Sequence, residues 1–190
     1  MESAFEKILK TGKTVLDTQD LSIIWGISKT DYLKTKVYRL VKAGKLLKLA
    51  RGLYTLAEKP DFMELANKIV VPSYVSFETV LGQNGVIFQY YGAVYSASRL
   101  NTTVKISGRE FAYRKIKDGI LLNNTGLIND GKRTYAIVER ALVDTLYLFP
   151  DFSVDNLRPV KKNLAIKIAK MYGNKKLIER IKNLWEGEDV

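Results

Sequence analysis

The feature that most constrains the fold of this chain is a basic segment, residues 28–51, in which the spacing of the apolar residues changes at Gly44. Before Gly44 the apolar residues recur at helical spacing, and after it two short apolar runs flank a turn, as in a β-hairpin. From Ser28 to Arg51 the segment carries eight Lys or Arg residues and one acid, a net charge of +7 within a chain of +11. It therefore predicts a basic helix followed by a basic hairpin, which together suit an anionic partner.

The residues before this segment predict further helices. An initial helix is expected to end by Gly12, and after a short extended piece Asp17 or Thr18 can cap a second helix that Gly26 closes. The three-residue turn 26–28 then leads into the basic helix. A helix, a short turn containing Gly and a second helix are typical of a helix-turn-helix.

The apolar stripe of the basic helix determines which side chains face outward. Leu33 and Val37 lie on one face, so at about 100° per residue Thr35, Arg39 and Lys42 lie on the opposite face. In a major groove, an arginine can bind guanine, a threonine can contact a thymine methyl and a lysine can contact phosphate. A solvated charged face is the alternative interpretation.

The hairpin that follows completes the pattern of a winged helix. It spans 45–56, and Gly52 can adopt the positive φ that a tight turn needs, which leaves Arg51 at the tip to contact a minor groove or the DNA backbone. We therefore predict a winged helix that binds double-stranded DNA. Its predicted contact residues are Ser28, Lys29, Tyr32, Lys34, Thr35, Lys36, Tyr38, Arg39, Lys42, Lys45, Lys48 and Arg51.

Two absent residue types limit the chemistry of the chain. It contains no Cys and no His, which excludes Cys or Ser nucleophiles paired with His and ordinary zinc sites. A metal site would need several converging carboxylates, whereas the acids are spread along the sequence. We expect no catalytic residue, no metal and no cofactor, and we do not expect an enzyme.

The sequence also argues against a membrane protein. Charged residues interrupt the first apolar positions, unlike the apolar core of a signal peptide. No apolar run approaches the ~18 to 20 residues of a membrane span. We expect a cytoplasmic protein with no membrane contact.

A break at Pro60 predicts two domains, a winged helix over 1–59 and an α+β domain over 60–190. The second domain is expected to contain short helices before residue 88, a small antiparallel sheet within 88–117, and helices over 136–149 and 159–185. Segregated helices and hairpins argue against a βαβ nucleotide-binding fold.

Two motifs in the second domain could suggest catalysis. Residues 126–133 match part of a P-loop, but Arg133 replaces the Ser or Thr that holds Mg²⁺, so we predict a hairpin or loop. Glu139, Arg140 and Asp144 fall on one helix, where we expect a surface ion pair worth a few tenths of a kcal/mol.

Aromatic and basic residues of the second domain could form an effector surface. Tyr90, Tyr91, Tyr95 and Tyr113 could stack on single-stranded RNA, although tyrosines in strands are usually half-buried. The basic residues of this predicted surface are Arg99, Lys105, Arg109, Arg114, Lys115, Arg158, Lys161, Lys162 and Lys167.

Three segments carry a resemblance to a known family. They are RGLYTL at 51–56, SYVSFETVLGQNGVI at 73–87 and YAIVERALVDTLYL at 135–148. With the helix-turn-helix, they resemble the AbiEi-type antitoxins of bacterial abortive-infection (type IV toxin-antitoxin) systems. The resemblance covers about residues 5 to 175 of the chain. It implies a bacterial phage-defence protein that represses its own operon through a winged helix and counteracts a nucleotidyltransferase toxin of the AbiEii type.

Two other classes of function fit the same sequence. One is an RNA-binding or RNA-processing protein that uses the winged helix for targeting. The other is a winged-helix transcription factor whose second domain senses a small ligand. A neighbouring nucleotidyltransferase gene would favour the antitoxin, and a neighbouring metabolic gene would favour the sensor.

Overall fold

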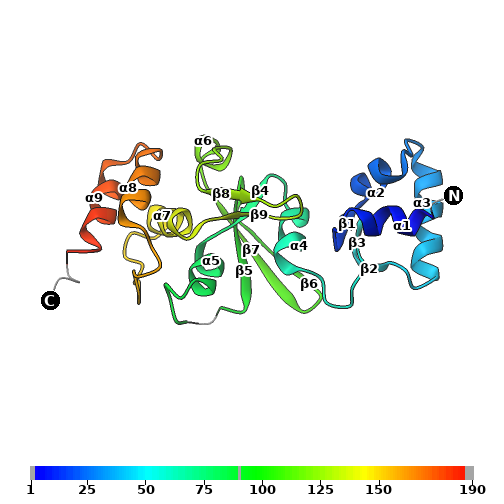
Figure 1. The fold of residues 1–190 in the computed structure, drawn as a ribbon, viewed down its shortest axis with the longest axis horizontal. Helices are drawn as coiled ribbons and strands as arrows, with labels where there is room; N and C mark the ends of the chain where they lie inside the picture. Colours follow the sequence, from blue (N-terminus) through cyan, green and yellow to red (C-terminus); the bar gives the residue numbers. More distant parts are fainter. Residues whose placement is uncertain (1–2, 90, 187–190) are drawn as a thin grey trace. The chain divides into compact units, whose positions relative to one another are not determined.

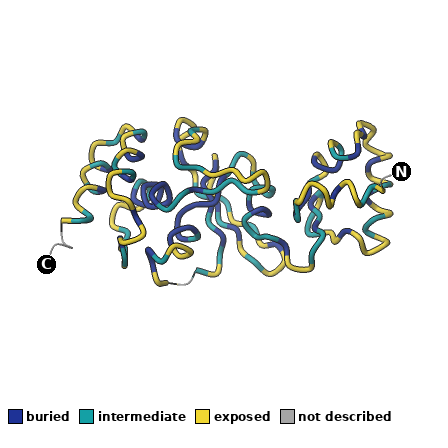
Figure 2. Tube along the Cα trace, viewed as in Figure 1, coloured by how far each residue is buried: buried dark blue, intermediate teal, exposed yellow. Residues whose placement is uncertain are grey.

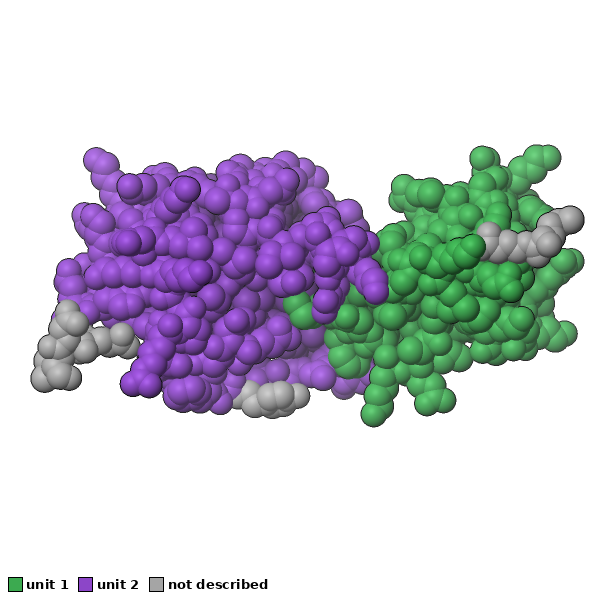
Figure 3. Space-filling model, in the orientation of Figure 1, with its two compact units in different colours: residues 1–69 green, residues 70–190 purple. Residues whose placement is uncertain are grey.

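The computed structural model describes residues 3–89 and 91–186, which combine helices with two β-sheets (Figure 1). They divide into two compact units, one ending at Ile69 and the other beginning at Val70 (Figure 3). The sequence placed this boundary after residue 59. That expectation is wrong by one helix, because α4 (Phe62–Ile69) belongs to the first unit.

The first unit begins with three helices interrupted by one strand. They are α1 (Ala4–Lys10), β1 (Val15–Asp17), α2 (Thr18–Trp25) and α3 (Thr30–Lys42). A hairpin of β2 (Leu47–Ala50) and β3 (Leu53–Thr55) follows. Strand β3 lies between β1 and β2 and pairs antiparallel with both. The expected extended piece, helices and hairpin of this region are therefore present.

Local signals explain where these helices begin and end. The Asp17 carboxylate accepts a hydrogen bond from the backbone N–H of Asp20, and the Asp20 carboxylate accepts one from the N–H of Asp17, which is a capping box at the start of α2. Gly26 ends α2 in the left-handed conformation, with φ of 64°. Such a residue is strongly favoured as glycine, because a Cβ would be strained there.

The core of the first unit is formed by the apolar faces of its helices and strands. Its buried members are Ile8, Leu16, Leu21, Trp25, Ile27, Leu33, Val37 and Leu46. The Trp25 indole N–H donates to the backbone carbonyl of Ala4 at 2.9 Å, which ties α2 to α1. The apolar stripe expected on α3 is therefore the face that is buried.

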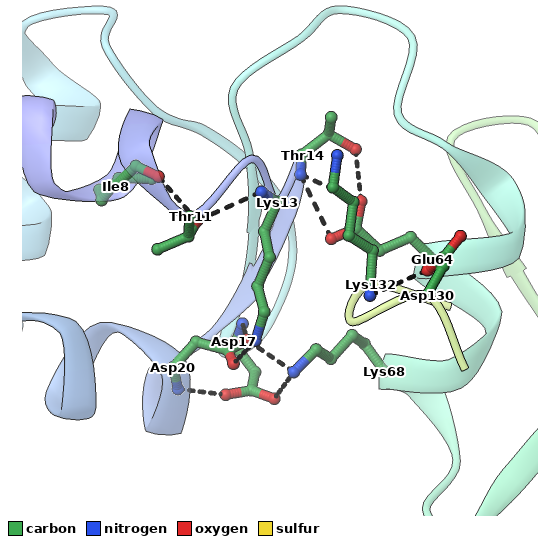
Figure 4. A network of polar contacts seen from close by, with 10 residues as sticks. All are labelled: Ile8, Thr11, Lys13, Thr14, Asp17, Asp20, Glu64, Lys68, Asp130 and Lys132. Atoms are coloured by element: carbon green, nitrogen blue, oxygen red, sulfur yellow. Dashed lines mark hydrogen bonds and ion pairs between the residues drawn. The ribbon is translucent and has the colours of Figure 1, made fainter. Parts of the chain in front are cut away.

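Buried and half-buried polar contacts attach α4 to the first unit (Figure 4). Glu64 is 1% exposed, and its carboxylate accepts hydrogen bonds from the backbone N–H and the hydroxyl of Thr14. The Lys68 ammonium lies 3.0 Å from the Asp17 carboxylate and 2.6 Å from that of Asp20. Because these partners lie about 50 residues away in the sequence, the local break at Pro60 does not reveal the attachment.

The second unit contains a six-stranded sheet with the order β6-β7-β5-β4-β9-β8. The strands are β4 (Ser73–Val75), β5 (Ala93–Ser98), β6 (Thr102–Ile106), β7 (Arg109–Lys115), β8 (Leu127–Asn129) and β9 (Thr134–Ala136). The pairs β5/β7 and β4/β9 are parallel and the other three are antiparallel. The expectation of a small antiparallel sheet is therefore wrong. The β6–β7 hairpin folds back so that β7 lies beside β5.

The helices of the second unit are α5 (Phe77–Gln83), α6 (Asp118–Leu121), α7 (Val138–Leu148), α8 (Lys162–Lys170) and α9 (Lys175–Asn183). The two last helices, separated near Gly173, confirm the sequence prediction, and so does the β8–β9 hairpin, whose first strand and turn lie in 126–133. Helix α7 packs against α5, α8 and α9 and is buried along most of its length (Figure 2).

Candidate nucleic-acid interface

The outward face of α3 carries the side chains that the sequence assigned to it. Tyr32, Thr35, Arg39 and Lys42 are all exposed, and they follow one another at intervals of three or four residues. The flanking Ser28, Lys29, Lys34 and Tyr38 are exposed as well. Because α3 buries Leu33 and Val37 on its other side, this face is fixed toward solvent.

Most basic side chains of α3 and of the β2–β3 hairpin lack a counter-charge within the described residues. Within residues 3–89 and 91–186, Arg39, Lys42, Lys48 and Arg51 make no ion pair and no side-chain hydrogen bond. An exception in the same helix is Lys34, whose ammonium lies 3.5 Å from the Asp31 carboxylate. Unpaired surface cations attract polyanions over distances set by the ionic strength.

Two contact residues proposed from the sequence are held against aromatic rings. The Lys36 ammonium lies 4.8 Å from the centre of the Trp25 ring, and the Lys36 side chain is half-buried. The Lys45 ammonium lies 5.6 Å from the centre of the Phe5 ring, although Lys45 remains exposed. Lys36 is therefore partly withdrawn from the face that Arg39 defines.

The β2–β3 hairpin presents a second group of basic side chains. Gly52 has φ of 77°, and its carbonyl accepts a hydrogen bond from the backbone N–H of Thr18 at 3.1 Å. This contact anchors the hairpin turn to the start of α2, and Arg51 is exposed at the turn. Lys48 is exposed on β2, an edge strand of the sheet.

Within the second unit the basic residues of the predicted effector surface do not form one group. Lys105, Arg109, Arg114 and Lys115 belong to β6 and β7, whereas Lys162 and Lys167 belong to α8, and Figure 1 shows these elements at opposite ends of the unit. Of the others, Arg99 precedes β6, and Arg158 and Lys161 precede α8. Arg99 is paired with Asp118 at 3.1 Å, and the Lys162 ammonium lies 5.7 Å from the Trp185 ring centre.

Arg114 is half-buried, and neighbouring side chains engage its charge, so it is not a freely exposed surface cation as expected. Its guanidinium makes two hydrogen bonds of 2.6 Å to the Glu78 carboxylate. It also lies 4.4 to 4.9 Å from the centres of the Tyr95, Phe149 and Phe77 rings. We call these five residues the Arg114 cage. Arg109 is half-buried, and one of its guanidinium nitrogens donates to the Gly92 carbonyl at 2.8 Å.

A stacking platform made of the four tyrosines is not present. Tyr113 is 3% exposed, and burial raises the pKa of its phenol. Tyr95 is half-buried beside Arg114, and its ring meets that of Tyr91 edge to face. Tyr90 lies outside the described residues. The expectation that strand tyrosines are buried or half-buried holds for Tyr95 and Tyr113.

The predicted surface ion pair on α7 is wrong, because Arg140 and Asp144 are completely buried. The Asp144 carboxylate accepts hydrogen bonds from the hydroxyls of Tyr74 at 3.0 Å, Ser76 at 2.7 Å and Tyr172 at 2.5 Å. We call Arg140 and these four residues the Asp144 cluster. It joins β4, α7 and the segment after α8.

Besides its bond to Asp144, the Arg140 guanidinium donates hydrogen bonds to backbone carbonyls. Its guanidinium donates to the carbonyls of Ile120 at 2.9 Å and Thr125 at 2.7 Å, and to the Tyr74 hydroxyl at 2.9 Å. These bonds hold the end of α6 and the loop before β8 against α7. Glu139 is also buried, and its carboxylate accepts a hydrogen bond from the backbone N–H of Lys161.

Burial dominates the protonation of the Asp144 cluster. It raises the pKa of Asp144 above the usual value, against the opposing effects of Arg140 and the three hydroxyl donors. Burial, reinforced by the Asp144 charge, also raises the pKa of the Tyr74 and Tyr172 phenols. The cluster is sealed from solvent, so a substrate has no access to it, and the arrangement is that of a structural network.

Comparisons with known proteins leave the family of this chain open. No family model matches it, and it has no match among curated proteins. None of the helices in the described residues combines the length and apolar character that a bilayer crossing requires. Among the same residues, no three acidic side chains lie close enough together to hold a metal ion.

Proposed function

We propose that residues 1–69 form a winged helix-turn-helix that binds double-stranded DNA, with α3 in the major groove. The observation that carries the proposal is the outward face of α3, where Thr35, Arg39 and Lys42 are exposed, and where Arg39 and Lys42 have no ion pair within the described residues. The element order and the three-stranded sheet support it, since a helix-turn-helix followed by a hairpin provides one element for the groove and one for the backbone.

In this proposal the side chains divide between two kinds of contact. Arg39 reaches base edges, since a guanidinium can donate two hydrogen bonds to guanine. Lys42 on α3, Lys48 on β2 and Arg51 at the hairpin turn contact phosphates, which position the protein without reading sequence. The half-buried Lys36 contributes charge rather than a direct base contact.

The proposal extends to an antitoxin that represses its own operon and counteracts a nucleotidyltransferase toxin. This part is supported by the resemblance of residues 51–56, 73–87 and 135–148 to the AbiEi-type antitoxins. The second and third of these segments contain β4, α5 and α7, and the Asp144 cluster joins β4 to α7. The antitoxin role is therefore assigned to the second unit.

The RNA-binding alternative has less support from the structure. It relied on tyrosines and basic residues of β5 to β7 acting together, but Tyr113 is buried and Arg114 is enclosed in its cage. The ligand-sensing alternative is distinguished from the antitoxin by the adjacent gene: a metabolic gene would favour the sensor, and a nucleotidyltransferase gene would favour the antitoxin.

A mobility shift with the protein's own promoter tests the DNA proposal. With about 6 phosphate contacts, affinity should fall on the order of a thousandfold between 50 and 200 mM salt. Lys48→Ala should weaken promoter and random DNA equally. Lys7→Ala is the matched control, since it removes an exposed Lys from α1, outside the proposed interface. A response that does not depend on salt would exclude the assignment.

The antitoxin proposal is tested by expressing the full chain with the product of an adjacent nucleotidyltransferase gene. Arg39→Ala should weaken repression of a promoter reporter but leave the rescue of growth intact, because the substituted residue lies in the first unit. Loss of both activities would show that neutralisation requires DNA binding. Absence of rescue by the unaltered chain would exclude the antitoxin role and leave the DNA proposal standing.

A further inference from the structure

The loop between α7 and α8 borders two neighbouring hollows of the second unit. The first has a volume of about 390 Å³ and is lined by Phe149, Asp151 and Phe152 together with part of the Arg114 cage. The second, of about 310 Å³, shares Asp151 and Phe152 and adds Asp155. Asp151 and Phe152 thus separate two spaces, each large enough for a long side chain.

The charge of these hollows is opposite to that of the protein. Among the described residues that line them, the acids are Glu78, Asp151 and Asp155, and Arg114 is the one cation. Since Glu78 neutralises Arg114 through two hydrogen bonds, two carboxylates remain in a chain whose net charge is +11. Nucleic acid would be repelled here, whereas a cation would be attracted.

The neighbouring Arg114 cage shows how such a surface binds a guanidinium. Three aromatic rings surround Arg114 at cation–π distance, and one carboxylate binds it through both oxygens. Phe149, a member of this cage, is 40% exposed and lines the first hollow beside Phe152 and Asp151. The hollow therefore repeats the chemistry of the cage, with aromatic rings and a carboxylate that face solvent.

Hydrogen bonds to the segment before β5 hold the loop in place. The Asp155 carboxylate accepts a hydrogen bond from the Phe88 backbone N–H at 2.7 Å. The backbone N–H groups of Asp155 and Asn156 donate to the Val86 carbonyl at 3.0 and 3.1 Å, and the Asn156 amide donates to the Gly85 carbonyl. Because both hollows are formed in the free protein, a ligand does not have to order the loop.

We propose that these hollows bind a basic peptide segment of a partner protein, with one Arg or Lys side chain in each hollow. In the first hollow, Asp151 pairs with the bound cation, and the rings of Phe149 and Phe152 contact its aliphatic stem and its charged end. The proposal does not depend on DNA binding, which involves the other unit.

Fluorescence anisotropy of a labelled peptide tests the proposal with the full-length protein. The probe is fluorescein-labelled Gly-Ser-Arg-Gly-Arg-Ser-Gly, and the control peptide carries Gln in place of both Arg residues. Asp151→Asn should weaken binding fivefold or more, and Phe152→Ala should weaken it similarly. Asp118→Asn is the matched control, since it removes one exposed acid of the same unit outside the hollows.

The long-range charge of the protein makes the test stringent, because a cationic peptide must bind against a net charge of +11. Binding of the Arg peptide that Asp151→Asn weakens and Asp118→Asn does not would support the proposal. Equal affinity of the Asp151→Asn variant and the unaltered protein would overturn it. Equal affinity for the Gln peptide would overturn it as well.

Discussion

Helices α3 and α7 use the same kinds of charged residue in opposite ways. In α3, Arg39 and Lys42 face solvent, and the helix is held by the apolar residues of its other face. In α7, Arg140 and Asp144 are buried and hydrogen-bond to each other. Asp144 also accepts hydrogen bonds from two tyrosines, and Arg140 donates to backbone carbonyls. A charged residue on a helix can therefore belong to the solvent-exposed surface or to the core.

The two helices differ in the free-energy cost of removing the ion-pair partner of a charged side chain. An exposed arginine returns to water at little cost, so an exposed pair is worth about 0 to 1 kcal/mol. A buried arginine without its carboxylate remains an uncompensated charge, which costs about 3 to 5 kcal/mol. The comparison predicts that substitutions in α3 change binding and that substitutions in α7 change stability.

The largest effect is expected for Asp144→Ala. This change leaves Arg140 without its counter-charge and the Tyr74, Ser76 and Tyr172 hydroxyls without an acceptor, so the free energy of unfolding should fall by about 3 to 5 kcal/mol. Urea unfolding monitored by circular dichroism measures it. Asp118→Ala, at an exposed acid of the same unit, should change stability by less than about 0.5 kcal/mol. A loss below about 1 kcal/mol for Asp144→Ala would contradict the buried cluster.

Gly126→Ala should destabilise the same cluster without altering a charge. Gly126 has φ of 74°, and an added Cβ would lie 3.0 Å from the Arg140 Cβ and 3.1 Å from the Ile168 Cδ1. The positive φ and the close contacts together should cost about 1 to 3 kcal/mol. Gly131→Ala is the control in the next loop, where φ is also positive but no atom lies within 4 Å of the added Cβ. Equal losses for both variants would assign the effect to φ alone.

Arg39→Ala should separate binding from stability on α3. Loss of a base contact should weaken promoter binding by about 1 to 3 kcal/mol and reduce the preference over random DNA. The free energy of unfolding should stay within about 0.5 kcal/mol, because Arg39 is exposed and unpaired within the described residues. Titration by anisotropy and urea unfolding of the same preparations measure both quantities. A variant that loses stability but keeps its DNA affinity would show that Arg39 stabilises the fold and does not contact DNA.

The smallest effect concerns pH and the Asp20–Lys68 contact of the first unit. Burial alone would raise the pKa of Asp20, but hydrogen bonds from Lys13 and Lys68 outweigh it and lower the pKa. A lowered pKa gives stability that is present above the usual value near 3.8 and is lost as the pH falls through the folded value. In the second unit, Asp144 has a raised pKa, so its pH-dependent contribution to the free energy of unfolding has the opposite sign and declines as the pH rises.

Asp20→Asn should therefore reduce the acid sensitivity of the first unit below pH 4, by less than about 1 kcal/mol. The measurement is acid unfolding followed by Trp25 fluorescence in a Trp185→Phe background, which leaves Trp25 as the single tryptophan. Asp31→Asn is the control, since Asp31 is exposed on α3. Identical acid midpoints for Asp20→Asn and the unaltered chain would show that the contact adds nothing to stability.

The fold of α3 follows from local pattern, whereas that of α7 depends on distant residues. On α3 the apolar stripe and the exposed basic face could both be predicted. On α7 a signal was present, because Asp144 lies one turn after Ala141 and two turns after Ile137, within the apolar stripe. Its partners Tyr74 and Ser76 lie about 70 residues away, and no local pattern connects them to it.

The sheet and the unit boundary were missed for the same reason. Strand alternation predicts strands, but whether β7 or β6 pairs with β5 depends on contacts across the fold. The break at Pro60 was visible, but the bonds from Glu64 to Thr14 that place α4 in the first unit were not. Of the predicted DNA-contact residues, Lys36 alone is half-buried, because its stem packs on Trp25.

The mutual dependence of Arg140 and Asp144 has an evolutionary consequence. A single replacement at either position passes through a destabilised protein, so we expect related chains to keep both residues or to replace both by apolar ones. Thr35, Arg39 and Lys42 carry no such penalty and can change one at a time as a target sequence drifts. If α3 binds DNA as proposed, a lineage of such proteins could acquire new DNA targets while the interior of its second unit stays the same.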